Sequence, residues 1–349
     1  MQLRIIPVIL ILTLLLLSAG CIQTEPGSLP SVPDTPPANE TVAEEHNEDP
    51  QLVTPEYTVQ YFEKTAYIPS VSISQAAYLA DRNDLVLDMD GNMQQYYTNL
   101  IETDFEKEFL SVFAETIQTA ANQSGIPYVE LVIRMIQEIP YDADAPLAIR
   151  SPSEVIIDQT GDCDEKALLA AALLSQGGYD TCLLLYKPIY HPVYSVGHAT
   201  IGIAATRTSS LSSYRNYLQA EVTGRALIGD LSTKGNSQYM DGTPYVIQIG
   251  DGEKTYDVSS DLRDVTADLY RLHRNIDTMY AFLETENAWF ETQYPNPSWS
   301  NEYINAYNDR VRHFNNIYEE YSKASDAAAK IQDQINDLTA IRTLLAQAG

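Results

Sequence analysis

The segment Gly161–Ala167 constrains the fold more than any other part of the chain, because it marks a helix start ahead of several short strands. Asp162 is a suitable N-cap, and Glu165 can reach back to it, as in a capping box. The helix stays apolar until the Gly177-Gly178 pair, which suits a C-cap. Short apolar runs then predict strands at 181–186, 198–204 and 217–222. A helix followed by several antiparallel strands is typical of an α+β domain.

Two further helices are expected before this segment. Apolar residues recur at helical spacing between about Met93 and Asn122, and Gly125 ends that pattern. Pro127 can open a second helix, over 128–138, because the first helical turn does not need its missing N–H. Later in the chain, Asp241-Gly242 predicts the turn of a β-hairpin over 238–249.

The C-terminal residues predict long helices. Val265, Leu269 and Leu272 begin an apolar seam whose spacings alternate between four and three, as in a coiled coil. The Pro295-Asn296-Pro297 segment breaks this helix, and a second helix is expected over about 300–346. We therefore predict a C-terminal helical hairpin. The alternative is that both helices fold back and complete the core of the preceding domain.

Residues 1–20 have the three-part layout of an export signal. Arg4 gives a positive start, and the apolar run after it is too short for a comfortable membrane span. The segment Leu17–Cys21 resembles the lipobox of prokaryotic lipoproteins, which implies cleavage before Cys21 and attachment of lipid to its sulfur. An uncleaved anchor helix is the alternative. In both cases the rest of the chain is expected on the outer face of the cell membrane.

Composition predicts a tether and excludes one class of partner. Residues 21–55 are rich in Pro, Glu and Asp and poor in large apolar groups, which predicts a disordered tether. The chain carries 48 Asp and Glu against 21 Lys and Arg, a formal net charge of -27. This charge repels phosphate backbones, so no nucleic acid is expected as a partner. The predicted domains are a signal peptide (1–20), the tether (21–55), an α+β domain (56–262) and the helical hairpin (263–349).

Besides Cys21, the chain contains Cys163 and Cys182. Outside the cytoplasm these two cysteines can form a disulfide. However, Cys182 lies within an apolar run that predicts a buried strand, so we interpret it as a small core residue. On that interpretation Cys163 keeps a free thiol.

Cys163 lies where a helix favours a thiolate. In the first turn, backbone N–H groups and the positive end of the helix dipole stabilise a negative sulfur. Asp164 and Glu165 oppose this effect, so a neighbouring imidazolium is required. His198 is the candidate general base, and Glu221 on the next predicted strand can orient its ring. On adjacent antiparallel strands two such side chains can meet.

Three segments resemble the transglutaminase-like superfamily, within the papain-like cysteine fold. They are Ile136–Tyr141, Gly161–Ala167, and Gly197–Ala199 together with Glu221–Gly224. The resemblance covers about residues 132–230 and is especially close to prokaryotic surface members with a Gly-Asp-Cys-Asp motif. It implies a cysteine-bearing helix packed on an antiparallel sheet. It also implies the roles of nucleophile, base and orienting acid for Cys163, His198 and Glu221.

Four side chains leave alternatives open. The superfamily usually has Asp in the third role, so Asp230 is the alternative to Glu221, and Gln137 is a candidate oxyanion donor. His191 competes as the base, although its loop before a proline favours a position at the rim. No zinc-ligand spacing and no phosphate-binding glycine loop occurs, so neither a metal nor a cofactor is expected.

Together these features predict a lipid-anchored surface enzyme that transfers acyl groups from protein or peptide amides through a Cys163 thioester. Hydrolysis is favoured over cross-linking, because water is the abundant acceptor outside the cell. The alternative is a non-catalytic module that binds proteins with the same fold, the helical hairpin serving as docking element. The acidic residues around Cys163 and the apolar seam of the hairpin favour that alternative.

Overall fold

The computed structural model describes residues 50–84, 92–142, 148–190, 195–230, 242–293 and 300–348. By its internal contacts the chain divides into two units, and these residues belong to the unit Asp49–Gly349. The predicted signal peptide, Cys21 and most of the predicted tether lie outside the described residues, as do His191 and Asp241. Within the described ranges, no helix combines the length and hydropathy needed to cross a membrane.

Regular structure begins within the predicted tether. The first strands form two antiparallel pairs, β1 (Gln51–Val53) with β4 (Ser72–Ser74) and β2 (Tyr57–Tyr61) with β3 (Lys64–Ile68). The boundary predicted at residue 55 therefore lies too late. Composition missed β1 because its flanks are polar, whereas Leu52 pairs with Ile73 and packs against the main core.

Helices precede the main sheet in the order α2 (Gln75–Asp84), α3 (Met93–Glu102), α4 (Asp104–Ser124), α5 (Tyr128–Gln137), α6 (Pro152–Asp158) and α7 (Cys163–Gln176). The prediction of one continuous helix from Met93 was wrong. Thr103 has an extended backbone, and its hydroxyl caps α4 by accepting the N–H of Glu106 at 3.1 Å. The apolar spacing continues through this break, so periodicity alone does not reveal it. The predicted bounds of α5 and α7 are confirmed to within one residue.

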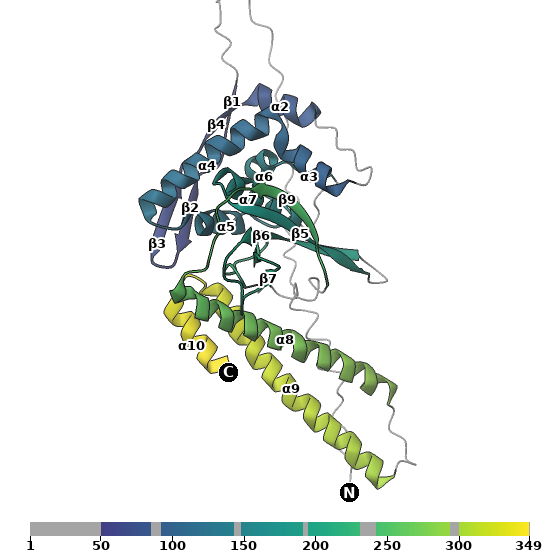
Figure 1. The fold of residues 1–349 in the computed structure, drawn as a ribbon. Helices are drawn as coiled ribbons and strands as arrows, with labels where there is room; N and C mark the ends of the chain where they lie inside the picture. Colours follow the sequence, from purple (N-terminus) through teal and green to yellow (C-terminus); the bar gives the residue numbers. More distant parts are fainter. Residues whose placement is uncertain are drawn as a thin grey trace, which may run out of the picture. The chain divides into compact units, whose positions relative to one another are not determined.

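The main sheet has five strands among the described residues, in the order β7-β8-β6-β5-β9, and all neighbours are antiparallel (Figure 1). Its members are β5 (Asp180–Tyr190), β6 (Ser195–Ala204), β7 (Ser213–Tyr214), β8 (Tyr217–Ala220) and β9 (Tyr245–Asp251). The three predicted strands correspond to β5, β6 and β8. The expectation of helices combined with antiparallel sheet is confirmed.

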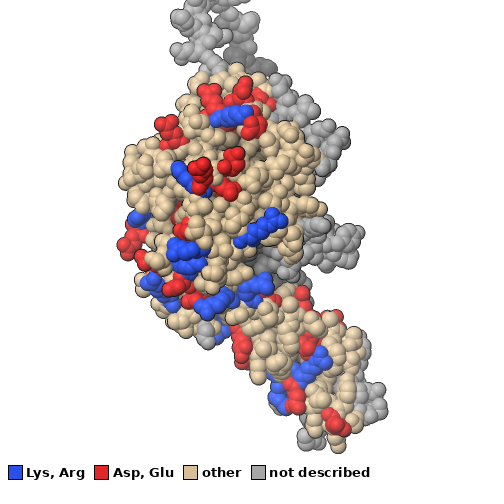
Figure 2. Space-filling model, in the orientation of Figure 1, with Lys and Arg blue, Asp and Glu red and all other residues tan. Residues whose placement is uncertain are grey.

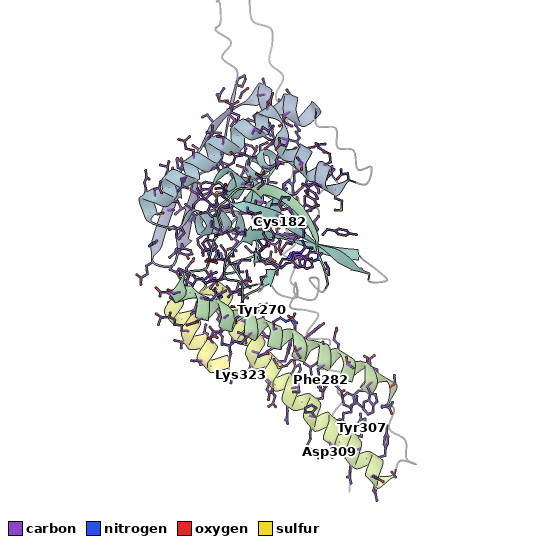
Figure 3. All side chains as sticks on the ribbon, in the orientation of Figure 1. Cys182, Tyr270, Phe282, Tyr307, Asp309 and Lys323 are labelled. Atoms are coloured by element: carbon purple, nitrogen blue, oxygen red, sulfur yellow. The ribbon has the colours of Figure 1, made fainter. Side chains whose placement is uncertain are left out.

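Each face of this sheet has its own packing. Helix α7 covers one face, where Ile201 and Ile203 of β6 share the main core with it. Because side chains alternate along a strand, Cys182, Leu184 and Tyr186 of β5 form a separate cluster on the other face, and Tyr186 is the register partner of His198. Cys182 is buried on that second face (labelled in Figure 3), and its thiol is free. Its interpretation as a core residue is confirmed.

The C-terminal helices α8 (Ser260–Thr292) and α9 (Asn301–Asp333) lie side by side as a hairpin, followed by α10 (Leu338–Ala348) (Figure 1). The prediction of one second helix to residue 346 was wrong, because it ends at Asp333 and a new helix begins at Leu338. Ile341 of α10 is buried in a cluster with residues of α8 and α9. Helix α10 therefore packs against the base of the hairpin.

Both interpretations of the C-terminal helices hold for part of their length. Leu262 of α8 belongs to the main core, and Leu227, from the loop after β8, packs with Val265 and Leu269. The far half of the hairpin has a separate cluster built only from α8 and α9, which includes the labelled residues Phe282 and Tyr307 (Figure 3). The start of α8 thus completes the domain core, whereas the far half stabilises itself.

Charged side chains are interspersed on the face of the molecule drawn in Figure 2, where basic groups lie among acidic ones. Exposed ion pairs among the described residues include Arg225 with Glu138 at 2.8 Å. Pairs of this kind contribute about 0–1 kcal/mol each. The fold is therefore held by its apolar core and by buried polar contacts.

Candidate active site

Cys163 is the first residue of α7, as the capping pattern predicts. The Asp162 carboxylate accepts the N–H of Glu165 at 3.1 Å, and the Glu165 carboxylate accepts the N–H of Asp162 at 3.0 Å. This capping box is confirmed. It holds the first turn of α7 so that the thiol is half-buried at the helix end.

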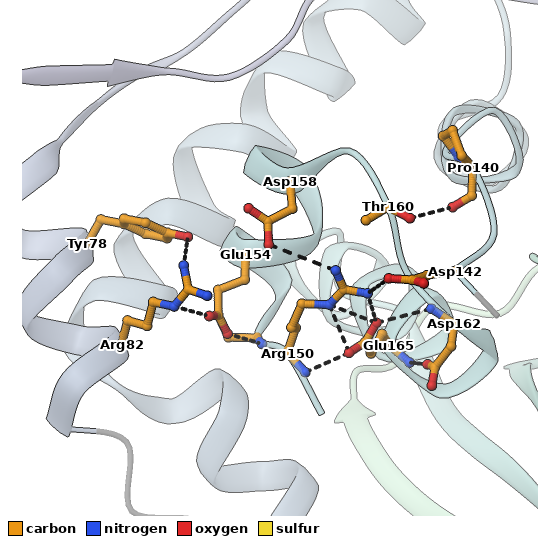
Figure 4. Close-up of polar contacts among 11 residues, drawn as sticks. Tyr78, Arg82, Pro140, Asp142, Arg150, Glu154, Asp158, Thr160, Asp162 and Glu165 are labelled. Carbon is orange, nitrogen blue, oxygen red and sulfur yellow. Dashed lines mark hydrogen bonds and ion pairs between the residues drawn. The ribbon is translucent and has the colours of Figure 1, made fainter. Parts of the chain in front are cut away.

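Arg150 fixes this helix start from a neighbouring loop (Figure 4). The carboxylate of Glu165, whose side chain is 1% exposed, accepts the backbone N–H of Arg150 at 2.9 Å and its Nη2 at 2.8 Å. Arg150 also contacts Asp142 at 3.1 Å and Asp158 at 3.9 Å. Sequence analysis did not find Arg150, because a single arginine in a loop has neither a periodic pattern nor a motif.

His198, on β6, and Glu221, which directly follows β8, are in contact. The Nε2 atom of His198 lies 2.8 Å from Oε2 of Glu221, and both side chains are buried. Oε1 of Glu221 accepts the N–H of Val222 at 2.9 Å and the N–H and hydroxyl of Thr223 at 2.8 and 2.6 Å. Burial alone would raise the pKa of the Glu221 carboxyl, but His198 and Thr223 outweigh it and hold the pKa below its usual value. Glu221 is therefore a carboxylate at neutral pH.

Cys163 lies against the strand that carries His198. Its sulfur accepts a hydrogen bond from the backbone N–H of Ala199, and this contact favours the thiolate. Burial opposes it most strongly, followed by the charges of Asp164 and Asp162, and together they raise the pKa of the thiol to about 12. The resting cysteine is therefore a neutral thiol, and its proton must be taken by a base when the sulfur reacts.

The contact with Glu221 uses one nitrogen of the His198 ring. Because Nε2 is engaged by Glu221, Nδ1 is the ring nitrogen left to accept a proton. A carboxylate that binds one ring nitrogen selects the tautomer and stabilises the imidazolium that forms. The fold thus joins Cys163, at a helix start, to a His198–Glu221 pair on the sheet through Ala199.

Two other predicted groups have different partners. Asp230 is 0% exposed and binds Nδ1 of His273 on α8 at 3.1 Å, so it is not the acid beside His198. Gln137 donates its side-chain N–H groups to the carbonyl oxygens of Glu221 and Ala226, at 2.8 and 3.0 Å. Both of its amide hydrogens are used, so in this arrangement neither is left for the candidate oxyanion role. Gln137 instead holds the loop that follows β8.

The remaining sequence candidates add nothing to the described site. His191 lies outside the described residues, so its predicted rim position stays a prediction. In the described part of the chain, no group of three or more His, Cys, Asp or Glu side chains is placed to hold a metal ion.

Comparisons with known proteins give little guidance. No protein-family model matches the chain, and no curated protein matches it either. One solved structure that matches is that of a "putative cysteine protease" from Cytophaga hutchinsonii, with 12% identity and a TM-score of 0.27. The match covers 60% of this chain and 82% of that one. A likeness with so low a TM-score carries no argument about fold or chemistry, and the candidate site rests on its own geometry.

Proposed function

We propose that this protein is a thiol acyl-transfer enzyme that acts on protein or peptide amides, with Cys163 as nucleophile and His198 as general base. The observation that carries the proposal is the buried contact of 2.8 Å between His198 Nε2 and Glu221 Oε2, which leaves Nδ1 for the thiol proton. The resemblance of the Cys163, His198 and Glu221 segments to the transglutaminase-like superfamily supports the same roles.

The reaction follows from the protonation states. His198 Nδ1 takes the proton of the Cys163 thiol as the sulfur attacks the amide carbon, and Glu221 stabilises the imidazolium that results. The carbon–nitrogen bond then breaks, and the imidazolium gives its proton to the leaving amine. A thioester on Cys163 remains. Water attacks this thioester while His198 accepts its proton, and the proton returns to the sulfur as the acid leaves.

Two features of the setting belong to the proposal. We place the catalytic domain on the outer face of the cell membrane, anchored by lipid on Cys21, because residues 1–21 have the pattern of a lipoprotein signal. We favour hydrolysis over cross-linking, because water is the abundant acceptor there. Mass spectrometry of Cys21 in protein from membranes would detect the lipid, and an unmodified Cys21 peptide would contradict the anchor.

A second candidate function is a non-catalytic binding module. The raised pKa of the Cys163 thiol favours it, because a thiol among carboxylates is a poor resting nucleophile. The self-packed far half of the hairpin would then be the docking element.

One experiment separates the two candidates. The full chain is assayed against a library of internally quenched peptides, beside Cys163→Ala, His198→Ala and the matched control Cys182→Ala. Cleavage that disappears in the first two variants and persists in the third supports the enzyme. Cleavage that survives in Cys163→Ala or His198→Ala, or no cleavage by a folded wild-type chain, favours the binding module.

A further inference from the structure

Lys166 is a buried cation one helical turn beyond Cys163, and the chemistry above does not use it. Its side chain is 0% exposed. Its Nζ donates to the carbonyl oxygen of Ile139 at 2.6 Å. Burial of an ammonium costs several kcal/mol unless other charges compensate it, and one carbonyl does not supply a charge.

The compensating charges come from two other elements. Glu221, after β8, and Glu138, after α5, both favour the charged form of Lys166. Burial acts more strongly and lowers the pKa of Lys166 to about 8. Lys166 is therefore still an ammonium at neutral pH and loses its charge in mildly alkaline solution.

The carboxylate of Glu221, which favours the charged form of Lys166, disfavours the charged form of Cys163. The charges of Asp164, Asp162 and Glu221 all disfavour its thiolate. Asp164 is held in place by the hydroxyl of Tyr97 at 2.9 Å. Burial, followed by Asp164, raises the pKa of Asp162 itself to about 8, so at neutral pH the negative field at the sulfur comes mainly from Asp164 and Glu221. His198 supplies one compensating charge when it takes the thiol proton.

Lys166 is the single Lys or Arg in α7, and it follows Cys163 by three positions. Residues with this spacing lie on one side of a helix, with Cβ atoms about 5–6 Å apart. The third acidic residue at the helix start, Glu165, is paired with Arg150 and so does not neutralise Lys166. Glu221 acts on both Cys163 and Lys166.

We infer that the ammonium of Lys166 is the counter-charge that allows Cys163 to ionise among these carboxylates. The inference deepens the proposed function, because thiolate formation is the step that His198 drives there. In general, a unit charge that lies about 10 Å from a second group changes the pKa of that group by about one, when the effective dielectric constant is about 20. Loss of the charge would therefore reduce the thiolate fraction about tenfold below the pKa of the thiol.

A purely structural role for Lys166 makes a different prediction. Ile139 leads into Tyr141, which pairs with Gly161 just before the capping box, so Lys166 also tethers this segment. If tethering is its whole role, an uncharged side chain that still donates to the Ile139 carbonyl should replace Lys166 without changing the reactivity of Cys163.

The test measures the rate at which iodoacetamide alkylates Cys163 in the full chain without substrate, between about pH 6 and pH 10, by mass spectrometry of the Cys163 peptide. The variants are Lys166→Gln, which keeps an N–H donor without charge, and Lys166→Arg, which keeps the charge. Lys254→Gln is the matched control, because exposed Lys254 donates to the Gly177 carbonyl at 2.6 Å at the opposite end of α7. Thermal melting establishes that each variant is folded.

We expect alkylation of Lys166→Gln to be about three to ten times slower than that of wild type below pH 8. The lower bound allows for the greater nucleophilicity of a more basic thiolate. Lys166→Arg and Lys254→Gln should stay near the wild-type rate at neutral pH. A folded Lys166→Gln variant with the wild-type profile would overturn the inference and leave Lys166 as a tether.

If Lys166→Gln does not fold, wild type and Lys166→Arg decide the question. Arginine stays charged at alkaline pH, whereas Lys166 does not. At about pH 9–10 the arginine variant should therefore react faster than wild type, and coincident profiles would overturn the inference. These rates report ionisation of the resting thiol. The peptide assay of Cys163→Ala and His198→Ala tests the proposed function separately.

Discussion

Asp230 and His273 form a buried pair in which Nδ1 of the histidine lies 3.1 Å from Oδ1 of the aspartate. Asp230 belongs to the loop after β8, and His273 belongs to α8, so the pair joins the sheet to the C-terminal helices. The other oxygen of Asp230 has no hydrogen-bond partner among the described residues. His273 is therefore its main compensating group.

This pair makes stability depend on pH in a defined direction. Burial lowers the pKa of His273, but Asp230 and Asp277 outweigh burial and raise it above its unfolded value. Its contribution is then fully present below about pH 6.5 and is lost as the pH rises through the folded pKa. His273→Gln should lower the free energy of unfolding by about 2 kcal/mol at pH 6 and by much less at pH 9. Urea unfolding at both pH values measures this, with exposed His313→Gln as control. An equal loss at both values would show that packing, not charge, is involved.

The His198–Glu221 contact predicts that turnover falls sharply when one carboxylate oxygen of Glu221 is replaced by an amide nitrogen. Glu221→Gln keeps the shape of the side chain but removes the charge that stabilises the imidazolium and selects the tautomer of His198. Turnover of a cleaved peptide should fall by about two to four orders of magnitude. The exposed Glu102→Gln variant is the control. Comparable kcat/KM values for the two variants would rule out Glu221 as the orienting acid.

Ionisation of Glu106 should make the fold less stable as the pH rises towards 7. Burial raises the pKa of its carboxyl to about 7, although hydrogen bonds from Ser151 and Ser153 oppose the shift. The native state then holds a proton that the unfolded chain releases near pH 4.5, so stability falls as the pH rises from about 4.5 to 7. Glu106→Gln should remove this dependence and stabilise the chain above pH 7 by up to about 3 kcal/mol. Urea unfolding at pH 5 and pH 8 tests it, with exposed Glu108→Gln on the same helix as control. A loss of stability at pH 8 would contradict it.

Arg150 and Arg82 offer a comparison of a buried and an exposed arginine. Arg150→Met leaves the buried carboxylate of Glu165 uncompensated at the start of α7, and should cost about 3–5 kcal/mol. Arg82 pairs with Glu154 at 2.8 Å, but its side chain is 49% exposed, so Arg82→Met should cost less than about 1 kcal/mol. Denaturant unfolding of both variants at pH 7 gives the difference. Similar losses would mean that the Arg150 network does not hold the helix start.

Features that depend on contacts between residues close in the chain were mostly predicted correctly, whereas several features that depend on distant contacts were not. Periodicity and capping act within a few residues, and they predicted α5, α7 and the strands β5, β6 and β8. They missed the breaks at Thr103 and after Asp333, because the apolar spacing is similar on both sides of each break. They also missed β1, which pairs with a strand that lies about twenty residues away along the chain.

By itself, the sequence determined the local features of the site, namely the capping box of Asp162 with Glu165 and the position of Cys163 in the first turn. Such contacts join neighbours in the chain, so the residue types are sufficient. Only the tertiary structure decided which acid serves which histidine, Glu221 for His198 and Asp230 for His273. The register of β6 and β8 and the docking of α8 on the loop after β8 bring these partners together, and residue type and spacing do not specify either one.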